Sequence, residues 1–465
     1  MNGEKSVRPF GWRDKIGYMF GDFGNDFTFI FASLFLMVYY TKVLGISSGL
    51  VGILFLVARC LDAFTDITMG QLVDRMKPGK GGRFRPWLLR MCGPVAIASF
   101  LMYQSAIAQA SMTVRIVYMF VTYLLWGSIF YTAINIPYGS MASVMTADAD
   151  QRASLSTFRS MGAALAQILV GVVAPVFVYV NDVNGNQILD GTRMTVVAGV
   201  FSVGAIICYV VCYYMTVERV QIAPVDKAEH AGLGKTLHAL VTNRALLGII
   251  LAAILLLLSS LLTQSVNQYV FIDYFKNSKA VSLMTLIGMV PSFILVPFVV
   301  PITKKFGKKE ASAVGCILAG IASVALFFLQ VKSVWMYIAI STVGFIGFGF
   351  FNLVIWAFIT DVIDDQEVRT GRREDGTIYA VYSFARKIGQ ALAGGLGGFA
   401  LEVIGYDSSV QVQTPAVADS IYNIATLLPG LLYIGVGLAL IFVYPLNKKR
   451  VEENVAVLKG RRPAG

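Results

Sequence analysis

Three charged side chains stand within one long apolar stretch, and their spacing predicts a cation-binding site. Arg59, Asp62 and Asp66 interrupt the apolar run that begins at Leu50. Residues three and four apart lie on one face of a helix, so we expect these side chains to stack together. Two acids and one base leave an unbalanced negative charge, which a proton or Na⁺ bound at Asp62 and Asp66 would balance. The competing interpretation is an interhelical salt bridge that only holds the structure together.

Further polar side chains occur in other apolar stretches, and together they have the chemistry of sugar recognition. Carboxylates, amides and bases bond pairs of sugar hydroxyls, and the face of a Trp stacks on sugar C–H groups. The candidates for substrate binding are Asp26, Asn135, Arg159, Trp356, Ser383, Arg386 and Lys387. Two alternatives stay open. Trp356 is either a substrate contact or a lipid-facing or packing residue, and Asp26 facing Arg159 is either a substrate site or a structural salt bridge.

The residue types present argue against catalysis. The only histidines, His230 and His238, lie in a central polar stretch, and the five cysteines fall in apolar segments without metal-ligand spacing. An enzyme would need a nucleophile with a base, or a metal, so we expect no enzymatic activity and no cofactor besides a coupling cation. The net charge of +11 does not indicate a nucleic-acid partner, because Lys and Arg recur in short bursts between apolar segments.

The apolar stretches that must position these residues are long enough to cross a bilayer. The chain is 56% hydrophobic and only 14% charged, whereas soluble proteins have roughly 25% charged residues. A span needs about 20 apolar residues. We therefore predict an all-α polytopic membrane protein with twelve spans, at 15–41, 48–76, 87–108, 112–140, 153–180, 195–217, 244–273, 280–303, 311–331, 335–364, 376–404 and 417–445.

The distribution of bases predicts the orientation of these spans. If both termini are cytoplasmic, 28 of the 38 Lys and Arg residues lie on the cytoplasmic side and six lie in outer loops. Such a bias is typical of inner segments. We expect a multi-pass protein of the cell (inner) membrane that has the lipid bilayer among its partners and functions as a monomer.

A polar linker divides the chain into two halves. Residues 1–217 form the predicted N-terminal six-helix bundle, 218–243 a cytoplasmic linker, 244–446 the C-terminal six-helix bundle, and 447–465 a charged cytoplasmic tail that we expect to be disordered. The second span of each half ends in a turn of glycine and bases, VDRMKPGKGGRFRP in the first and PITKKFGKKEAS in the second. Corresponding turns of this kind are typical of a duplicated transporter.

Several motifs carry a resemblance to a known family. The strings GDFGNDF, LVARCLDAFTD, GGRFRPW, NIPYGS and FARKIGQALAGG occur in order along the chain. With them, the chain resembles the glycoside–pentoside–hexuronide:cation symporter family, within the major facilitator fold, over nearly its whole length. NIPYGS and the Arg386–Lys387 pair look most like the members that carry glucuronides.

The resemblance implies a function and roles for individual residues. It implies H⁺- or Na⁺-coupled symport of a glycoside or a sugar acid such as a glucuronide, by alternating access. Asp26, Arg159, Trp356 and Lys387 match positions tied to sugar binding. It implies a cation site formed by Asp62, Asp66 and Thr132. We include Thr65 in this predicted site, because it lies between the two acids. Rival interpretations are a cation-coupled carrier of another amphiphile, such as a lysolipid, and a membrane-embedded enzyme.

Overall fold

The computed structural model describes residues 8–76, 79, 81–146, 148–181, 187–220, 243–371 and 375–461. The chain divides into two compact units. Unit 1 comprises Met1–Ala228 together with Asp407–Val412, and unit 2 comprises Glu229–Tyr406 together with Gln413–Gly465. Most of the predicted linker, 221–242, lies outside the described residues.

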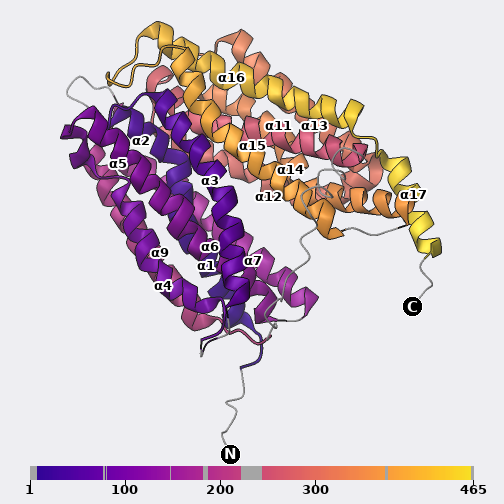
Figure 1. Cartoon of the computed structure of the whole chain (residues 1–465). Helices are drawn as coiled ribbons and strands as arrows, with labels where there is room; N and C mark the ends of the chain where they lie inside the picture. The colour runs from indigo at the N-terminus through magenta and orange to yellow at the C-terminus, as the bar shows by residue number, and fades with distance from the viewer. Residues whose placement is uncertain are drawn as a thin grey trace, which may run out of the picture. The chain divides into compact units, whose positions relative to one another are not determined.

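Unit 1 is built from long helices in the indigo to magenta part of the chain (Figure 1). In chain order they are α1 (Trp12–Phe31), α2 (Met37–Lys42), α3 (Ser48–Arg75), α4 (Arg85–Leu101), α5 (Met112–Leu124), α6 (Thr132–Met145), α7 (Ala149–Ile168), α8 (Ala174–Val178) and α9 (Gly191–Met215). Three π-helical turns, η1 (Ala32–Leu36), η3 (Leu125–Tyr131) and η4 (Leu169–Val173), each join two α-helices into one continuous rod, and a 3₁₀ turn, η2 (Ser105–Gln109), follows α4. A short antiparallel hairpin, β1 (Tyr179–Asn181) with β2 (Gln187–Leu189), pairs Tyr179 with Leu189.

Glycines on α1 and α7 let the helices of unit 1 approach closely. A Cβ atom added at Gly24 of α1 would lie 2.7 Å from the Cβ of Cys208 on α9. A Cβ at Gly162 of α7 would clash with the carbonyl oxygen of Met19 on α1. Small residues permit this kind of backbone contact between membrane helices. The contact fixes the register of α7 against α1, and with it the level at which their polar side chains meet.

A single carboxylate organises the start of α4. The two oxygens of Glu218 accept hydrogen bonds from the backbone N–H groups of Arg83, Phe84 and Arg85, at 2.7, 2.9 and 2.7 Å. The first N–H groups of a helix have no partner within it, and the helix dipole favours an anion there. The glycine-and-base turn after α3 is therefore tied to the segment that follows α9.

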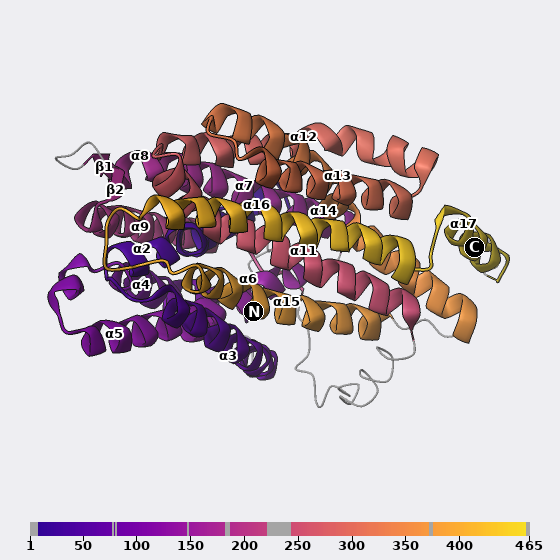
Figure 2. The ribbon, with the colours of Figure 1, turned by 90° about the horizontal axis from the view of Figure 1, so that it is seen from above.

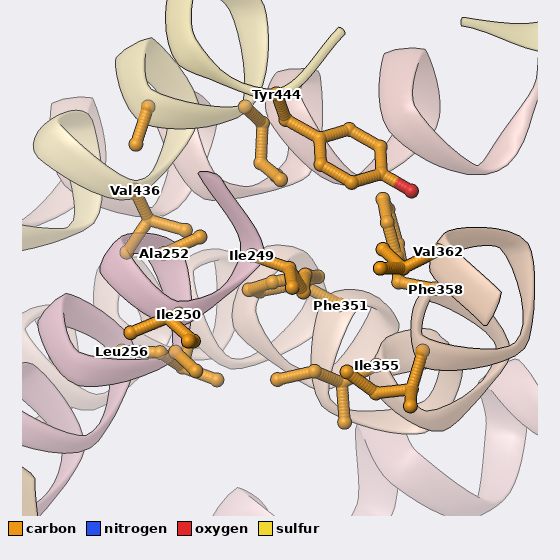
Figure 3. Close-up of a cluster of buried hydrophobic side chains, with 14 of the residues drawn as sticks. Ile249, Ile250, Ala252, Leu256, Phe351, Ile355, Phe358, Val362, Val436 and Tyr444 are labelled. Carbon is orange, nitrogen blue, oxygen red and sulfur yellow. The ribbon is translucent and has the colours of Figure 1, made fainter. Parts of the chain in front are cut away.

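Unit 2 contains the helices in the pink to yellow part of the chain (Figure 1). They are α11 (Arg244–Tyr269), α12 (Lys279–Phe306), α13 (Lys308–Leu329), α14 (Val334–Thr370), α15 (Asp375–Val403), α16 (Pro415–Leu438) and α17 (Lys448–Arg461), with the π-turns η5 (Val270–Tyr274) and η6 (Ala439–Val443) extending α11 and α16. Figure 3 shows the centre of its apolar core, where side chains of α11 such as Ile249, of α14 such as Phe351 and of α16 such as Val436 pack together below Tyr444.

The prediction of a disordered tail is wrong for residues 448–461, which form helix α17 (Figure 2). This helix packs against α14 through a fully buried carboxylate, Asp365. Asn454 donates a hydrogen bond to Asp365 at 3.1 Å, the Arg450 guanidinium lies 3.6 Å away, and Arg369 of α14 lies 2.8 Å away. The charged composition suggested disorder, but two polar groups of this segment, on Asn454 and Arg450, join Arg369 as partners of a buried acid.

The all-α membrane fold is confirmed, and the number of spans stays a prediction. Ten helices in the described residues are long and apolar enough to cross a membrane. The other two predicted spans, 48–76 and 376–404, correspond to α3 and α15. The charged residues of α3 lower its apolar character, and the apolar helix segment found in α15 is Ile388–Val403.

We expect the close contact at Gly162 to be essential for stability. Gly162→Ala should lower the free energy of unfolding by about 1–3 kcal/mol, because backbone atoms of α1 cannot yield to an added methyl group. The matched control is Gly93→Ala in α4, where an added Cβ meets nothing within 4 Å. Thermal unfolding of the purified protein in detergent measures both. Equal melting temperatures for the two variants would show that this contact does not set the helix register.

Candidate substrate and cation sites

The two acids of the predicted cation site, Asp62 and Asp66, lie on α3 and face the rod formed by η3 and α6 in unit 1. Ser128 of η3 donates a hydrogen bond from its Oγ to Asp62 Oδ1 at 2.6 Å. One helical turn further on, Thr132 of α6 donates from its Oγ1 to Asp66 Oδ1 at 3.1 Å. The two acids and two hydroxyls thus form a ladder in which each carboxylate of α3 meets one hydroxyl of the neighbouring rod.

Arg59 completes this group as a resident positive charge. Its guanidinium donates to Asp62 Oδ2 at 3.3 Å and lies 5.7 Å from the centre of the Phe29 ring. Thr65 uses its hydroxyl hydrogen locally, on the Asp62 carbonyl at 3.3 Å. Carboxylate and hydroxyl oxygens are the hard ligands that suit an alkali cation, and a carboxylate alone suffices for a proton. Among the described residues there is no cluster of three or more His, Cys, Asp or Glu of the kind that holds a transition metal.

Ser128 and Thr132 come from the fourth predicted span, from the π-helical turn η3 and from the start of α6. The two residues are four apart, as are Asp62 and Asp66, so each pair lies on one face of its helix. Ser128 therefore meets Asp62 one turn before Thr132 meets Asp66. Sequence reasoning named Thr132 from the family resemblance but missed Ser128, although its spacing from Thr132 is a signal that could have found it.

A second polar group joins α1 to α7. Arg159 donates from its Nε to Asp22 Oδ1 at 2.9 Å, and its guanidinium lies 5.4 Å from the centre of the Tyr138 ring. Asp22 is only 5% exposed. Of the two alternatives for Asp26 and Arg159, the structure therefore does not form the Asp26–Arg159 salt bridge, and the role of Asp26 in substrate binding stays a prediction. Asp22 and Asp26 lie on one side of α1. The register of α7 against α1, which is set at Gly162, brings Asp22 level with Arg159.

This pairing leaves Asp26 available. It is half-buried, and within the described part of the chain it forms no hydrogen bond or ion pair. Its neighbour Asn25 is fully engaged, donating to Tyr131 Oη at 2.8 Å and to Asn135 Oδ1 at 3.3 Å while accepting from Tyr209 Oη at 3.1 Å. Asn25 thus orients the amide of Asn135, whose N–H₂ group has no partner among the described residues.

The candidates of unit 2 form an aromatic platform with a base above it. The Trp356 and Tyr382 rings meet edge to face with centroids 5.4 Å apart. The Arg386 guanidinium lies 5.4 Å from the Trp356 ring centre and 5.9 Å from that of Tyr382. Trp356 remains 44% exposed, so it is not a core residue. The side chains of Ser383 and Lys387 lie outside the described residues, and their predicted roles stay predictions.

A helical membrane protein with paired charges, free polar groups and stacked aromatics inside its bundles has the makeup of a solute transporter. Comparison with known families identifies it further. The chain matches the family described as MFS/sugar transport protein over residues 17–448 and belongs to it. The predicted resemblance is thereby confirmed, and the chain is a transporter, not an enzyme.

Individual relatives agree with this assignment. The chain is 32% identical to the uncharacterized symporter YjmB of Bacillus subtilis, over 94% of this chain and 93% of that protein. It is 31% identical to the glucuronide carrier protein homolog of Escherichia coli, over 98% of this chain and 97% of that protein. Among solved structures it is similar to the nucleoside transporter NupG, with a TM-score of 0.63 at 13% identity over 93% of this chain and 99% of that one, which bears on the fold alone.

The distinct environments of Asp22 and Asp26 predict distinct mutant behaviour. Asp22→Asn should destabilise the protein and Arg159→Gln should do so as well, with a coupling energy of about 1–2 kcal/mol in a double-mutant cycle. Asp26→Asn should leave the melting temperature close to that of the parent, because it breaks no ion pair, while removing substrate binding. Additive effects of Asp22→Asn and Arg159→Gln on stability would contradict the pairing.

Proposed function

We propose that this protein is a cation-coupled symporter of a glycoside or a sugar acid such as a glucuronide. The observation that carries the proposal is the ladder of Asp62 and Asp66 against the hydroxyls of Ser128 and Thr132. Membership of the sugar transport family, a relative named as a symporter and another named as a glucuronide carrier homolog support it. The finer predictions of twelve spans, cytoplasmic termini, an inner-membrane location and a monomer are part of the same proposal.

The coupling cation would act by changing the hydrogen-bond and ion-pair partners of the two α3 carboxylates, Asp62 and Asp66. In the structure, Asp62 divides its two oxygens between Ser128 and Arg59. A proton or Na⁺ would offset the second acid, Asp66, and so allow both carboxylates to remain in apolar surroundings. A membrane potential supplies roughly 2.3 kcal/mol per charge per 100 mV, enough for about fifty-fold accumulation with one cation.

Each unit, taken by itself, has side chains whose chemistry suits a sugar. In unit 1, the Asp26 carboxylate would accept hydrogen bonds from two sugar hydroxyls, and the Asn135 N–H₂ group would donate a further one. In unit 2, Trp356 and Arg386 are the predicted contacts, because an aromatic ring can stack on a sugar ring and a guanidinium can bind a carboxylate through two parallel N–H bonds. Arg159 would act mainly through Asp22, whose ion pair holds it in place.

Uptake into membrane vesicles tests this proposal directly. A panel of labelled glycosides and uronides is measured with a sodium gradient, with a proton gradient, and with neither. We expect accumulation of at least one sugar or sugar acid with one of the two gradients. Equal uptake with and without both gradients for every sugar tested would contradict coupled symport.

Loss of one ladder acid should uncouple the transporter. Asp66→Asn should abolish accumulation against a gradient, because an amide cannot balance the charge of a bound cation, while substrate exchange across the membrane partly survives. Thr132→Ala is the companion variant, since it removes only the hydroxyl that meets Asp66, and it should weaken the cation dependence without abolishing it. Both are measured by gradient-driven uptake and by exchange. Full accumulation by Asp66→Asn would remove Asp66 from the cation site.

Arg386 should distinguish charged from neutral substrates. Arg386→Gln should weaken glucuronide binding roughly ten- to more than hundredfold, because a charge-assisted contact contributes about 1.5–3 kcal/mol. Binding of the matching uncharged glucoside should change much less. Arg386→Lys keeps the charge and loses the planar fork, so it should restore only part of the affinity. An equal loss of affinity for the glucuronide and the glucoside would show that Arg386 stabilises the aromatic platform and does not bind the substrate carboxylate.

A further inference from the structure

A basic cavity lies in unit 2, apart from every predicted substrate and cation residue. It has a volume of about 430 Å³ and is formed where α12 ends, α13 begins, α14 passes and α17 begins. Four lysines line it, namely Lys304, Lys308, Lys309 and Lys448. This is the part of the chain where the sequence predicts a cytoplasmic turn of glycine and bases.

The positive charge of the cavity is only partly balanced. Two acids line it: Asp361 pairs with Lys308 at 2.5 Å, and Glu452 lies 3.8 Å from Lys448. Lys309 donates only to backbone carbonyls, those of Ile441 and Tyr444, at 3.1 and 2.6 Å. Within the described residues, Lys304 has no hydrogen-bond or ion-pair partner and is exposed. Four bases against two acids give the cavity a net charge of +2.

Two helix N-termini add to this field. Gly307, Lys308 and Lys309 of the cavity wall form the start of α13, which is 22 residues long, and Asn447 and Lys448 form the start of α17, which is 14 residues long. The N-terminal end of a helix carries a partial positive charge and favours an anion. One acid outside the lining of the basic cavity reduces this positive field. Glu310 accepts a hydrogen bond from the Lys448 backbone N–H at 3.4 Å.

The other walls of the cavity are apolar and continue into surface of the kind that faces lipid. Val300 lines the cavity and is 57% exposed, and Phe306, at the end of the same helix, is 55% exposed. A second cavity of about 650 Å³ lies between α12, α13 and α14, and its lining is apolar apart from Glu310. It is lined by side chains that include Leu295, Ile302, Val314, Leu318, Ile346 and Phe350.

We propose that the basic cavity binds the phosphodiester headgroup of an anionic phospholipid, with an acyl chain along the apolar groove of α12–α14. Lysines grouped beside apolar helix surface match the two chemistries of such a lipid, whereas a free anion needs only the first. Helix α17 supplies one wall through Lys448, Val451 and Glu452, and its docking on Asp365 makes the cavity complete. The bound lipid would therefore hold α17 against α12 and α13.

Matched lysine pairs make this testable on the full-length protein. Lys304→Gln with Lys448→Gln removes two charges that line the cavity. Lys305→Gln with Lys449→Gln removes the same charge from the adjacent positions of the same helices, and neither of those residues lines the cavity. Binding of phosphatidylglycerol and of phosphatidylcholine to each purified variant is measured by native mass spectrometry, with inorganic phosphate as a competitor.

We expect the parent to prefer phosphatidylglycerol. The cavity pair should lose roughly thirtyfold in affinity for it, since each lysine near a lipid surface contributes about 1 kcal/mol, while the control pair stays close to the parent. Glu452→Gln removes an acid from the cavity and should tighten binding, a gain that misfolding cannot produce. Equal losses in the two lysine pairs, no preference over phosphatidylcholine, or displacement of the lipid by inorganic phosphate would each overturn the proposal.

Discussion

An ionised side chain inside an apolar helix is stable only when another group of the protein meets it, and this constraint accounts for most polar contacts in the structure. Arg159 meets Asp22 across α1 and α7, and Arg59 meets Asp62 along α3. Removing one partner of such a pair leaves a charge that hydrocarbon cannot solvate. Among the residues that the structure describes, Asp26 and Arg386 have no ion-pair partner, which is consistent with their predicted contact with substrate.

Such pairs form only where helices approach at a defined level, and small residues make that approach possible. Gly162 rests on the Met19 carbonyl, and Gly24 on Cys208, so α1 cannot slide along α7 or α9 without a clash. In unit 2 the same device joins α13 to α14, where a Cβ at Gly347 would clash with the Gly315 carbonyl oxygen. Packing of apolar surface holds each bundle together, and these contacts select which polar groups meet.

One rod links this packing to the predicted cation site. Ser128 of η3 meets one carboxylate and Thr132 of α6 meets the other, so the rod contacts both acids of α3. A bound cation that altered either hydrogen bond would change the contact between α3 and the η3–α6 rod. This offers a local physical route by which a cation at Asp62 and Asp66 would influence Asn135, which lies one turn beyond Thr132 and is oriented by Asn25.

The sequence by itself determined the membrane fold, the family and the placement of Asp62 and Asp66 on one face of α3, because apolar length, charge within apolar runs and spacing on one helix are local properties. It did not identify Asp22 as the partner of Arg159, since that pairing depends on the register of two helices remote in sequence. It missed Ser128, because which residues of another helix meet an acid of α3 depends on how the two helices pack. It also assigned a charged tail to disorder, whereas residues 448–461 form α17, which contacts the buried carboxylate of Asp365 through Asn454 and Arg450. In each case the deciding group comes from another part of the chain, and only tertiary structure brings it into contact.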